Sequence, residues 1–126
     1  MSLILDAGAL IAYERGNRTV TAFLLDAAAA ENTVKTSTGV VAQVWRNGAR
    51  QAALAGLLQG VDEVELTPRR AREIGRLLGQ ARTTDVVDAS LVELAADGDE
   101  ILTSDPHDLL RVARASGKTL IITPVR

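Results

Sequence analysis

The hexapeptide Thr103-Ser104-Asp105-Pro106-His107-Asp108 is the most informative stretch of the chain. It closes the short apolar run Ile101-Leu102 and opens a segment with helical character that extends to Ser116. A strand that leads directly into a helix is typical of an α/β protein with a parallel sheet. In such a sheet, an acidic residue at the carboxyl end of a strand projects into the crevice where ligands bind. The hexapeptide therefore predicts both a fold class and a place for a functional site.

The same alternation of apolar runs and helical patterns continues through the chain. Five segments are expected as strands: Leu3–Leu5, Thr33–Thr36, Val61–Leu66 (at a sheet edge), Glu100–Thr103 and Thr119–Thr123. Helices are expected at Ala9–Arg15, at Val20–Ala30, from a cap at Thr38 through Trp45, at Gln51–Leu58, from Pro68 to Ala81, at Val86–Ala96 and at Asp108–Ser116. This order predicts an α/β fold with a mostly parallel five-stranded sheet. Residues 1–126 are expected to form a single domain.

Composition narrows the possible functions. The chain has 126 residues, 47% of them hydrophobic, with one Trp, one Tyr and one Phe, so the core must consist of aliphatic side chains. There is no cysteine, which excludes disulfides, zinc–thiolate sites and thiol catalysis. No apolar run approaches the ~20 residues of a membrane span, and a cytoplasmic protein without membrane contact is expected. The net charge of −2 neither favours nor excludes nucleic acid as a partner.

Acidic residues recur where strands end and helices begin. Asp6 follows the first expected strand, Asp105 follows the fourth, and Asp88 opens the helix before that fourth strand, with Asp85 three residues earlier. In a parallel sheet these places meet at one edge, where carboxylates repel one another unless a cation neutralises them. Oxygen ligands without cysteine favour Mg²⁺ or Mn²⁺. Such an ion can activate a bound water for attack on a phosphodiester.

Each acid also has a purely structural explanation. Asp6, Asp85 and Asp105 each precede a helix, where a carboxylate accepts a hydrogen bond from a backbone N–H group. Asp88 and Asp108 fall in a first helical turn, which the helix dipole favours. Taken one at a time, each position is open between a helix cap and a metal ligand. Their grouping at one sheet edge favours the metal site.

Four segments, in order and at suitable spacing, carry a resemblance that spans nearly the whole chain. They are Leu3–Ala12 (LILDAGALIA), Val40–Arg46 (VVAQVWR), Asp88–Val92 (DASLV) and Leu102–Leu109 (LTSDPHDL). With these segments the chain resembles the PIN-domain ribonucleases, in particular the VapC-like toxins of toxin–antitoxin pairs. The resemblance implies a three-layer α/β/α fold, Mg²⁺- or Mn²⁺-dependent endonucleolytic cleavage of RNA, a small antitoxin protein as partner, and a homodimer.

The resemblance also implies roles for individual residues. It places the central catalytic acids and metal ligands at Asp6, Asp88 and Asp105, with Asp108 as a further acid and Asp85 as a supplement to Asp88. Thr103 and Ser104 are hydroxyls next to these acids that can hydrogen-bond a phosphate or a ligated carboxylate.

One position departs from the family pattern. The family's second acid falls at Gln43, which keeps a carbonyl oxygen but removes one negative charge from the expected metal site. A weakly active enzyme and a catalytically silent RNA- or protein-binding module therefore remain alternatives. A phosphoacceptor regulatory domain fits less well, because Ala7-Gly8 stands where paired acids are needed.

Basic residues suggest where RNA would bind. Arg46 and Arg50 are expected on the helix that carries Gln43, where they either grip phosphate or form a solvated face. Arg69, Arg72 and Arg76 form a stripe on the helix after Pro68, which RNA, an acidic partner or solubility would each explain. His107 is the only histidine; it is either a general base or a solvated surface residue.

Overall fold

A five-stranded parallel sheet forms the centre of the molecule. The computed structural model describes residues 1–125. The strands are β1 (Ser2–Leu5), β2 (Thr33–Ser37), β3 (Asp62–Val64), β4 (Glu100–Thr103) and β5 (Ile121–Pro124), in the spatial order β3-β2-β1-β4-β5. Every neighbouring pair runs parallel. The five expected strands are therefore confirmed, with β3 at the edge.

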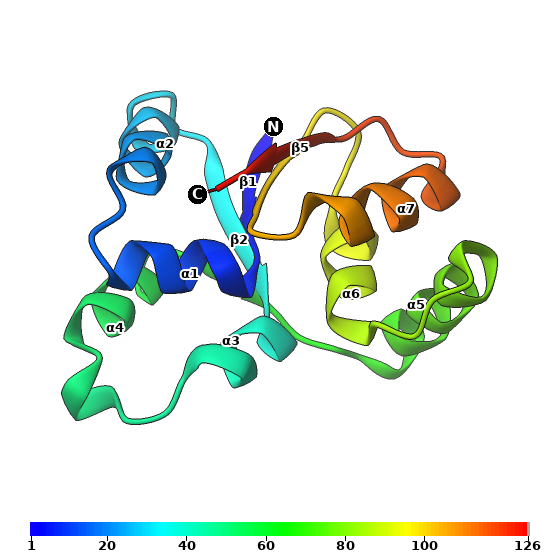
Figure 1. Ribbon diagram of the computed structural model, residues 1–126, viewed down its shortest axis with the longest axis horizontal. Coiled ribbons are helices and arrows are strands. Elements are labelled where there is room, and N and C mark those ends of the chain that lie inside the picture. The colour runs from blue at the N-terminus through cyan, green and yellow to red at the C-terminus, as the bar shows by residue number, and fades with distance from the viewer. Residues whose placement is uncertain (126) are drawn as a thin grey trace.

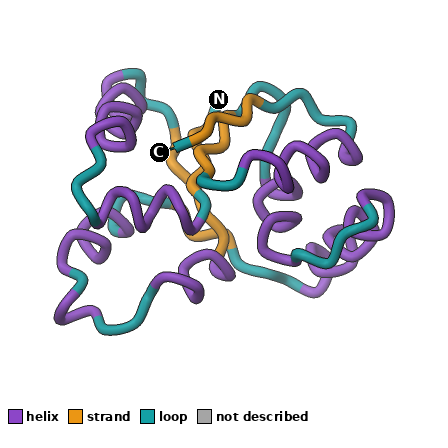
Figure 2. The backbone as a smooth tube through the Cα atoms, viewed as in Figure 1, coloured by secondary structure: helices purple, strands orange, loops and turns teal. Residues whose placement is uncertain are grey.

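Helices cover both faces of this sheet, which gives three layers (Figure 1). The α-helices are α1 (Ala7–Glu14), α2 (Arg18–Ala29), α3 (Thr38–Val44), α4 (Ala52–Leu58), α5 (Pro68–Ala81), α6 (Val86–Leu94) and α7 (Pro106–Ser116), and η1 (Gly48–Arg50) is a short 3₁₀ helix. Helices α1 to α4 lie on one side and α5 to α7 on the other, with the strands between them (Figures 1 and 2). Within residues 1–125, none of the helices has the length and apolar character needed to cross a membrane.

The order of the strands explains this division. From β1 the chain moves outward to β2 and β3, and it then returns to β4 and continues to β5 on the other side. Because crossovers between parallel strands are right-handed, the change of direction puts the later helices on the opposite face. The core is aliphatic, as the composition requires: Ile4, Leu5, Ile101 and Leu102 of the two central strands are completely buried.

Several helix boundaries differ from the expectation by one or two residues, and those of α3 bear on the candidate site. Helix α3 is capped by Ser37, whose Oγ accepts from the Val40 N–H at 3.2 Å, and Thr38 is already inside the helix. The helix ends at Val44 and does not continue to Trp45, and Arg46 lies in the turn that follows.

Candidate active site at the carboxyl edge of the sheet

The two central strands β1 and β4 mark the point where the sheet changes direction. They are paired with Leu5 opposite Leu102, so the next residues, Asp6 and Thr103, lie side by side at the carboxyl edge of the sheet. The chain after β1 turns towards β2, and the chain after β4 turns towards β5. This divergence opens the crevice in which open α/β sheets bind ligands. Asp6 and Asp105 therefore stand on either side of the expected ligand site.

Asp6 is buried, with 7% of its surface exposed. Its Oδ1 accepts a hydrogen bond from Ala9 N at 2.8 Å, which caps α1, and its Oδ2 accepts from Ser104 N at 3.3 Å. Burial raises the pKa of Asp6, and hydrogen bonds with the Thr103 side chain and with the backbone N–H groups oppose the rise. The carboxylate thus caps a helix and at the same time joins the ends of β1 and β4.

Gly8 allows the two segments to come this close. A Cβ atom at Gly8 would lie 1.9 Å from the Ser104 Oγ and 2.3 Å from the Ser104 Cβ. Real Cβ atoms do not approach other atoms at such distances, so any side chain at position 8 would push the β4–α7 loop away from α1. The absence of a side chain at Gly8 is therefore part of how Asp6 and Asp105 are brought together.

Helix α6 adds two more acids to the edge. Asp85 is its exposed N-cap residue, and its Oδ1 accepts from Asp88 N at 3.0 Å. Asp88 lies in the first turn and is half-buried. The capping function that the sequence allowed for Asp85 is confirmed.

The electrostatics of Asp88 show that all five predicted acids gather here. Burial, followed in order of size by the charges of Asp85, Asp6, Asp108 and Asp105, raises the pKa of Asp88 to about 7. Each of these carboxylates is thus close enough to repel Asp88. The acids come from three separate segments of the chain, after β1, at the start of α6 and after β4. We call these five residues the acidic cluster.

Asp105 does not cap its helix. It occupies the N-cap position of α7, yet its side chain makes no capping hydrogen bond, and its own N–H donates to the Thr103 Oγ1 at 2.9 Å. Asp108 and His107 are exposed in the first turn of α7. The structural explanation offered for Asp105 is therefore wrong, because its exposed carboxylate does not cap the helix.

Hydroxyl groups line the same edge, and sequence reasoning found only Thr103 and Ser104. Thr36, at the end of β2, is completely buried and its Oγ1 donates to Leu5 O at 2.7 Å. The Ser90 Oγ of α6 donates to the Ser37 Oγ at 2.9 Å. The hydroxyls of Thr36 and Ser37 could have been found from the sequence, because both residues stand at the end of an expected strand.

The predicted basic pair is not arranged as expected. Because α3 ends at Val44, Arg46 and Arg50 do not share a helix: Arg46 lies in a turn and Arg50 ends η1. The Arg46 Nη1 donates to Ala42 O at 3.1 Å and Trp45 O at 2.7 Å, so it closes the end of α3. Gln43 remains on α3 and is exposed.

The donor set suits a hard divalent cation, because it consists of carboxylate and hydroxyl oxygens. Among residues 1–125, however, no three acidic or histidine side chains are already arranged as ligands of one ion. The carboxylates of Asp6 and Asp85 are directed at backbone N–H groups instead. Coordination by three acids would therefore require side-chain rotation.

Comparisons with known proteins support the fold. No protein-family model matches the chain, and no curated protein sequence matches it. Among solved structures, it superposes on a chain of the crystal structure of VapBC2 from Rickettsia felis bound to a DNA fragment from their promoter, with a TM-score of 0.74. The match covers 100% of both chains at 15% sequence identity. The PIN-like three-layer fold implied by the resemblance is thereby confirmed.

Proposed function

We propose that this chain is a metal-dependent endoribonuclease of the VapC type, with Asp6, Asp88 and Asp105 as its central acids. The observation that carries the proposal is the gathering of four carboxylates around that of Asp88, at the carboxyl edge where the sheet changes direction. A fold gains nothing from collecting like charges in a half-buried crevice. Such an arrangement is expected where a cation neutralises them.

The residues divide the work by position. Asp6, Asp88 and Asp105 would hold Mg²⁺ or Mn²⁺, with Asp85 and Asp108 as outer ligands. When bound, the cation would lower the pKa of a water molecule and balance the charge that develops on the phosphate. Asp6 is held in place by the N–H groups of Ala9 and Ser104, and Thr103 steadies the same carboxylate.

The substrate and partners are part of the same proposal. RNA as the substrate and a homodimer rest on the family resemblance. The fold shared with a chain of a VapBC2 structure supports a small antitoxin protein as a partner.

A catalytically silent binding module is the second candidate. It is favoured by Gln43 in place of an expected acid, and by the absence, within residues 1–125, of a ready-made set of three acidic ligands. Asp85 is the carboxylate best placed to replace the missing charge, because it already lies beside Asp88.

Thermal unfolding in EDTA, Mg²⁺ and Mn²⁺ tests the metal site directly. Saturating metal should stabilise the parent, by about 2.7 kcal/mol at a hundredfold excess over the dissociation constant. Asp6→Asn should lose this effect and RNA cleavage while staying folded, because asparagine also caps helices well. Asp26→Asn, an exposed acid on α2, is the matched control.

The outcomes separate the two candidates. If Asp6→Asn cuts RNA as fast as the parent, the assignment of the acids is wrong. If the parent shows neither metal stabilisation nor cleavage, the silent module is favoured. In that case Gln43→Glu should restore both properties if the missing acid is the cause.

A further inference from the structure

A groove lies between α5 and α7, next to the acidic cluster. Its walls include Gln80 and Ala81 of α5 and, on α7, His107, Asp108, Arg111 and Arg114. Asp108 belongs both to the groove and to the acidic cluster. The groove and the acidic cluster are therefore adjacent and share Asp108.

One face of α7 gives this groove its charge. His107, Arg111 and Arg114 are spaced at i, i+4 and i+7, which places them on one side of the helix, while Leu109 and Val112 are buried on the other. Both arginines are exposed. Neither forms an ion pair nor donates a side-chain hydrogen bond to any of residues 1–125. The five N–H donors of each guanidinium are thus open to a ligand.

The arginine stripe on α5 is different. Arg72 donates to Pro68 O of its own helix at 3.2 Å, and Arg76 lies 3.6 Å from Glu73. These two side chains already have partners within α5. Two of the three arginines of this stripe are therefore already engaged, whereas both arginines on α7 have open donors beside the acidic cluster. Sequence reasoning did not single out this surface of α7.

The dimensions and chemistry of the groove fit a nucleic acid strand. Arg114 lies seven positions after His107, about 10 Å further along the helix axis, so this face of α7 is long enough to contact more than one nucleotide of a strand. Guanidinium groups match phosphate oxygens in a bidentate way. A protein partner would need apolar anchors, and the groove offers only Leu110, which is 36% exposed, beside small alanines.

We propose that this groove binds the phosphate backbone of a single RNA strand beside the bond to be cut, with Arg111 and Arg114 contacting neighbouring phosphates. The inference rests on the proposed nuclease function and adds the path of its substrate. The carboxylates of the acidic cluster by themselves repel the phosphates of RNA, and a basic groove beside them would offset this repulsion. The arginines supply the attraction that brings the strand to a negatively charged site.

Salt-dependent binding of a fluorescein-labelled oligouridine in EDTA tests the groove without turnover. The logarithm of the affinity falls with the logarithm of salt by about 0.7 for each phosphate contact to a single strand. Arg111→Gln/Arg114→Gln should therefore weaken binding and make the slope shallower by about 1.4. The control is Arg15→Gln/Arg18→Gln, which removes the same charge from two exposed arginines, one at the end of α1 and one at the start of α2. RNA cleavage in Mg²⁺ is measured in parallel.

The outcomes of these binding and cleavage measurements test the groove and the nuclease proposal separately. A shallower slope in the α7 variant alone supports the groove. Parent-like binding by the α7 variant, or equal losses in both double variants, overturns the groove, and cleavage by the parent would then leave the nuclease proposal intact. If the parent neither binds nor cuts oligouridine, the groove and the nuclease proposal both fail.

Discussion

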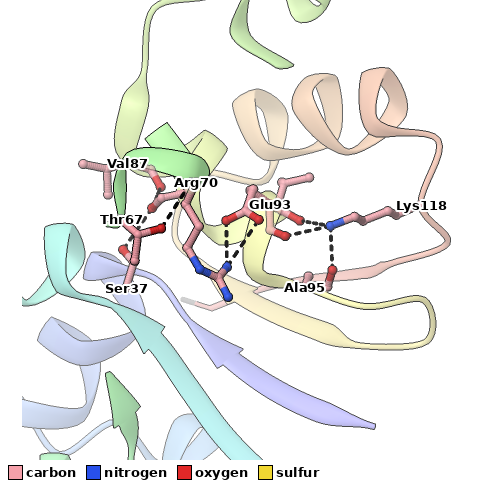
Figure 3. Close-up of polar contacts among 9 residues, drawn as sticks. Ser37, Thr67, Arg70, Val87, Glu93, Ala95 and Lys118 are labelled. Atoms are coloured by element: carbon pink, nitrogen blue, oxygen red, sulfur yellow. Dashed lines mark hydrogen bonds and ion pairs between the residues drawn. The ribbon is translucent and has the colours of Figure 1, made fainter. Parts of the chain in front are cut away.

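At the start of α6, four other carboxylates lie close enough to Asp88 to raise its pKa, whereas Glu93, less than two turns further along the same helix, is paired with Arg70. The Glu93 carboxylate accepts from the Arg70 Nη1 at 2.8 and 3.3 Å. The Lys118 ammonium donates to the carbonyls of Val92, Glu93 and Ala95 (Figure 3). The interactions of Arg70, Glu93 and Lys118 therefore join α5, α6 and the segment before β5. The like charges of the acidic cluster instead mark a place where a ligand can bind.

The pKa values follow the same contrast. Burial and like charges both raise the pKa of Asp88. Burial lowers the pKa of Lys118, but the neighbouring carboxylates of Glu93, Asp97 and Asp99 oppose that shift. The paired region should therefore stabilise the fold and lose stability when a partner is removed. The acidic cluster should gain stability when a charge is removed.

The largest effect is expected at Gly8, on which the geometry of the acidic cluster depends. Gly8→Ala should destabilise the protein by about 2–3 kcal/mol, because the new methyl group overlaps Ser104 and displaces the β4–α7 loop. The same displacement should lower RNA cleavage. Gly56→Ala on α4, where the added carbon would meet no atom within 4 Å apart from the neighbouring residues and the backbone of its own helix, should instead stabilise by about 0.5–1 kcal/mol. Urea unfolding measures both, and a neutral Gly8→Ala would mean that the close approach is not needed.

Next in size is the loss of Lys118. Lys118→Met should destabilise by about 2 kcal/mol, because the carbonyls at the end of α6 lose a charged donor. Lys35→Met, which removes a lysine whose side chain donates no hydrogen bond to residues 1–125, should have a smaller effect. Equal urea midpoints for the two variants would show that the paired region does not stabilise the fold in this way.

Removal of a charge from the acidic cluster should act in the opposite direction. The folded pKa of Asp88, about 7, lies above its ordinary value of 3.8, so between these values the folded protein binds the proton more tightly than the unfolded chain. In EDTA, stability should therefore fall as the pH rises from about 4 to 7. Asp88→Asn should remove this contribution and stabilise the metal-free protein at pH 8 by on the order of 1–2 kcal/mol, after allowance for solvent screening.

Thermal unfolding at several pH values, for the parent and Asp88→Asn, measures this effect. The curves of the two proteins should converge near pH 4, separate as the pH rises to about 7, and keep a constant difference above that pH. If Asp88→Asn is less stable than the parent at pH 8 in EDTA, the repulsion within the acidic cluster is not significant.

The smallest effect is expected for the Arg70–Glu93 pair. Its side chains are 31% and 17% exposed, so Glu93→Gln should cost about 0.5–1 kcal/mol. The Arg76–Glu73 pair is 73% and 53% exposed, and Glu73→Gln should change stability by about 0.3 kcal/mol or less. Urea unfolding with a precision of a few tenths of a kcal/mol distinguishes the two. Equal values would show that burial does not strengthen the pair that joins α5 and α6.

The fold and the acidic cluster were largely predictable from local patterns. The apolar runs Leu3–Leu5 and Ile101–Leu102 mark two strands, and Asp6 and Asp105 follow them directly or after two polar residues. The alternation of strands with helices predicts parallel pairing. Parallel pairing brings strand ends to one edge whatever the order of the strands. For this reason the sequence predicted that the acids lie together, although they are distributed along the chain from Asp6 to Asp108.

A break between Trp45 and Gln51 was expected, but the end of α3 at Val44 and the conformation of the turn after it were not predictable from the local pattern. No proline follows Val44, yet the helix stops there, because the Gln51 Oε1 accepts from Arg46 N and Asn47 N while the Gln51 Nε2 donates to Val44 O and to Glu14 of α1. These bonds replace those of a continued helix. They depend on α1 lying beside the turn, and this is why Arg46 and Arg50 were wrongly placed on one helix face.

The sequence by itself determined the strands, the helices and the edge at which the acids meet, since these depend on periodicity and on residues close together in the chain. The tertiary structure alone decided which acids are caps and which carboxylate stays open, how closely Gly8 lets the β4–α7 loop approach, and that α7 turns its two open arginines towards a groove beside α5. These features depend on distances between segments far apart in the chain, and only the packed fold sets those distances.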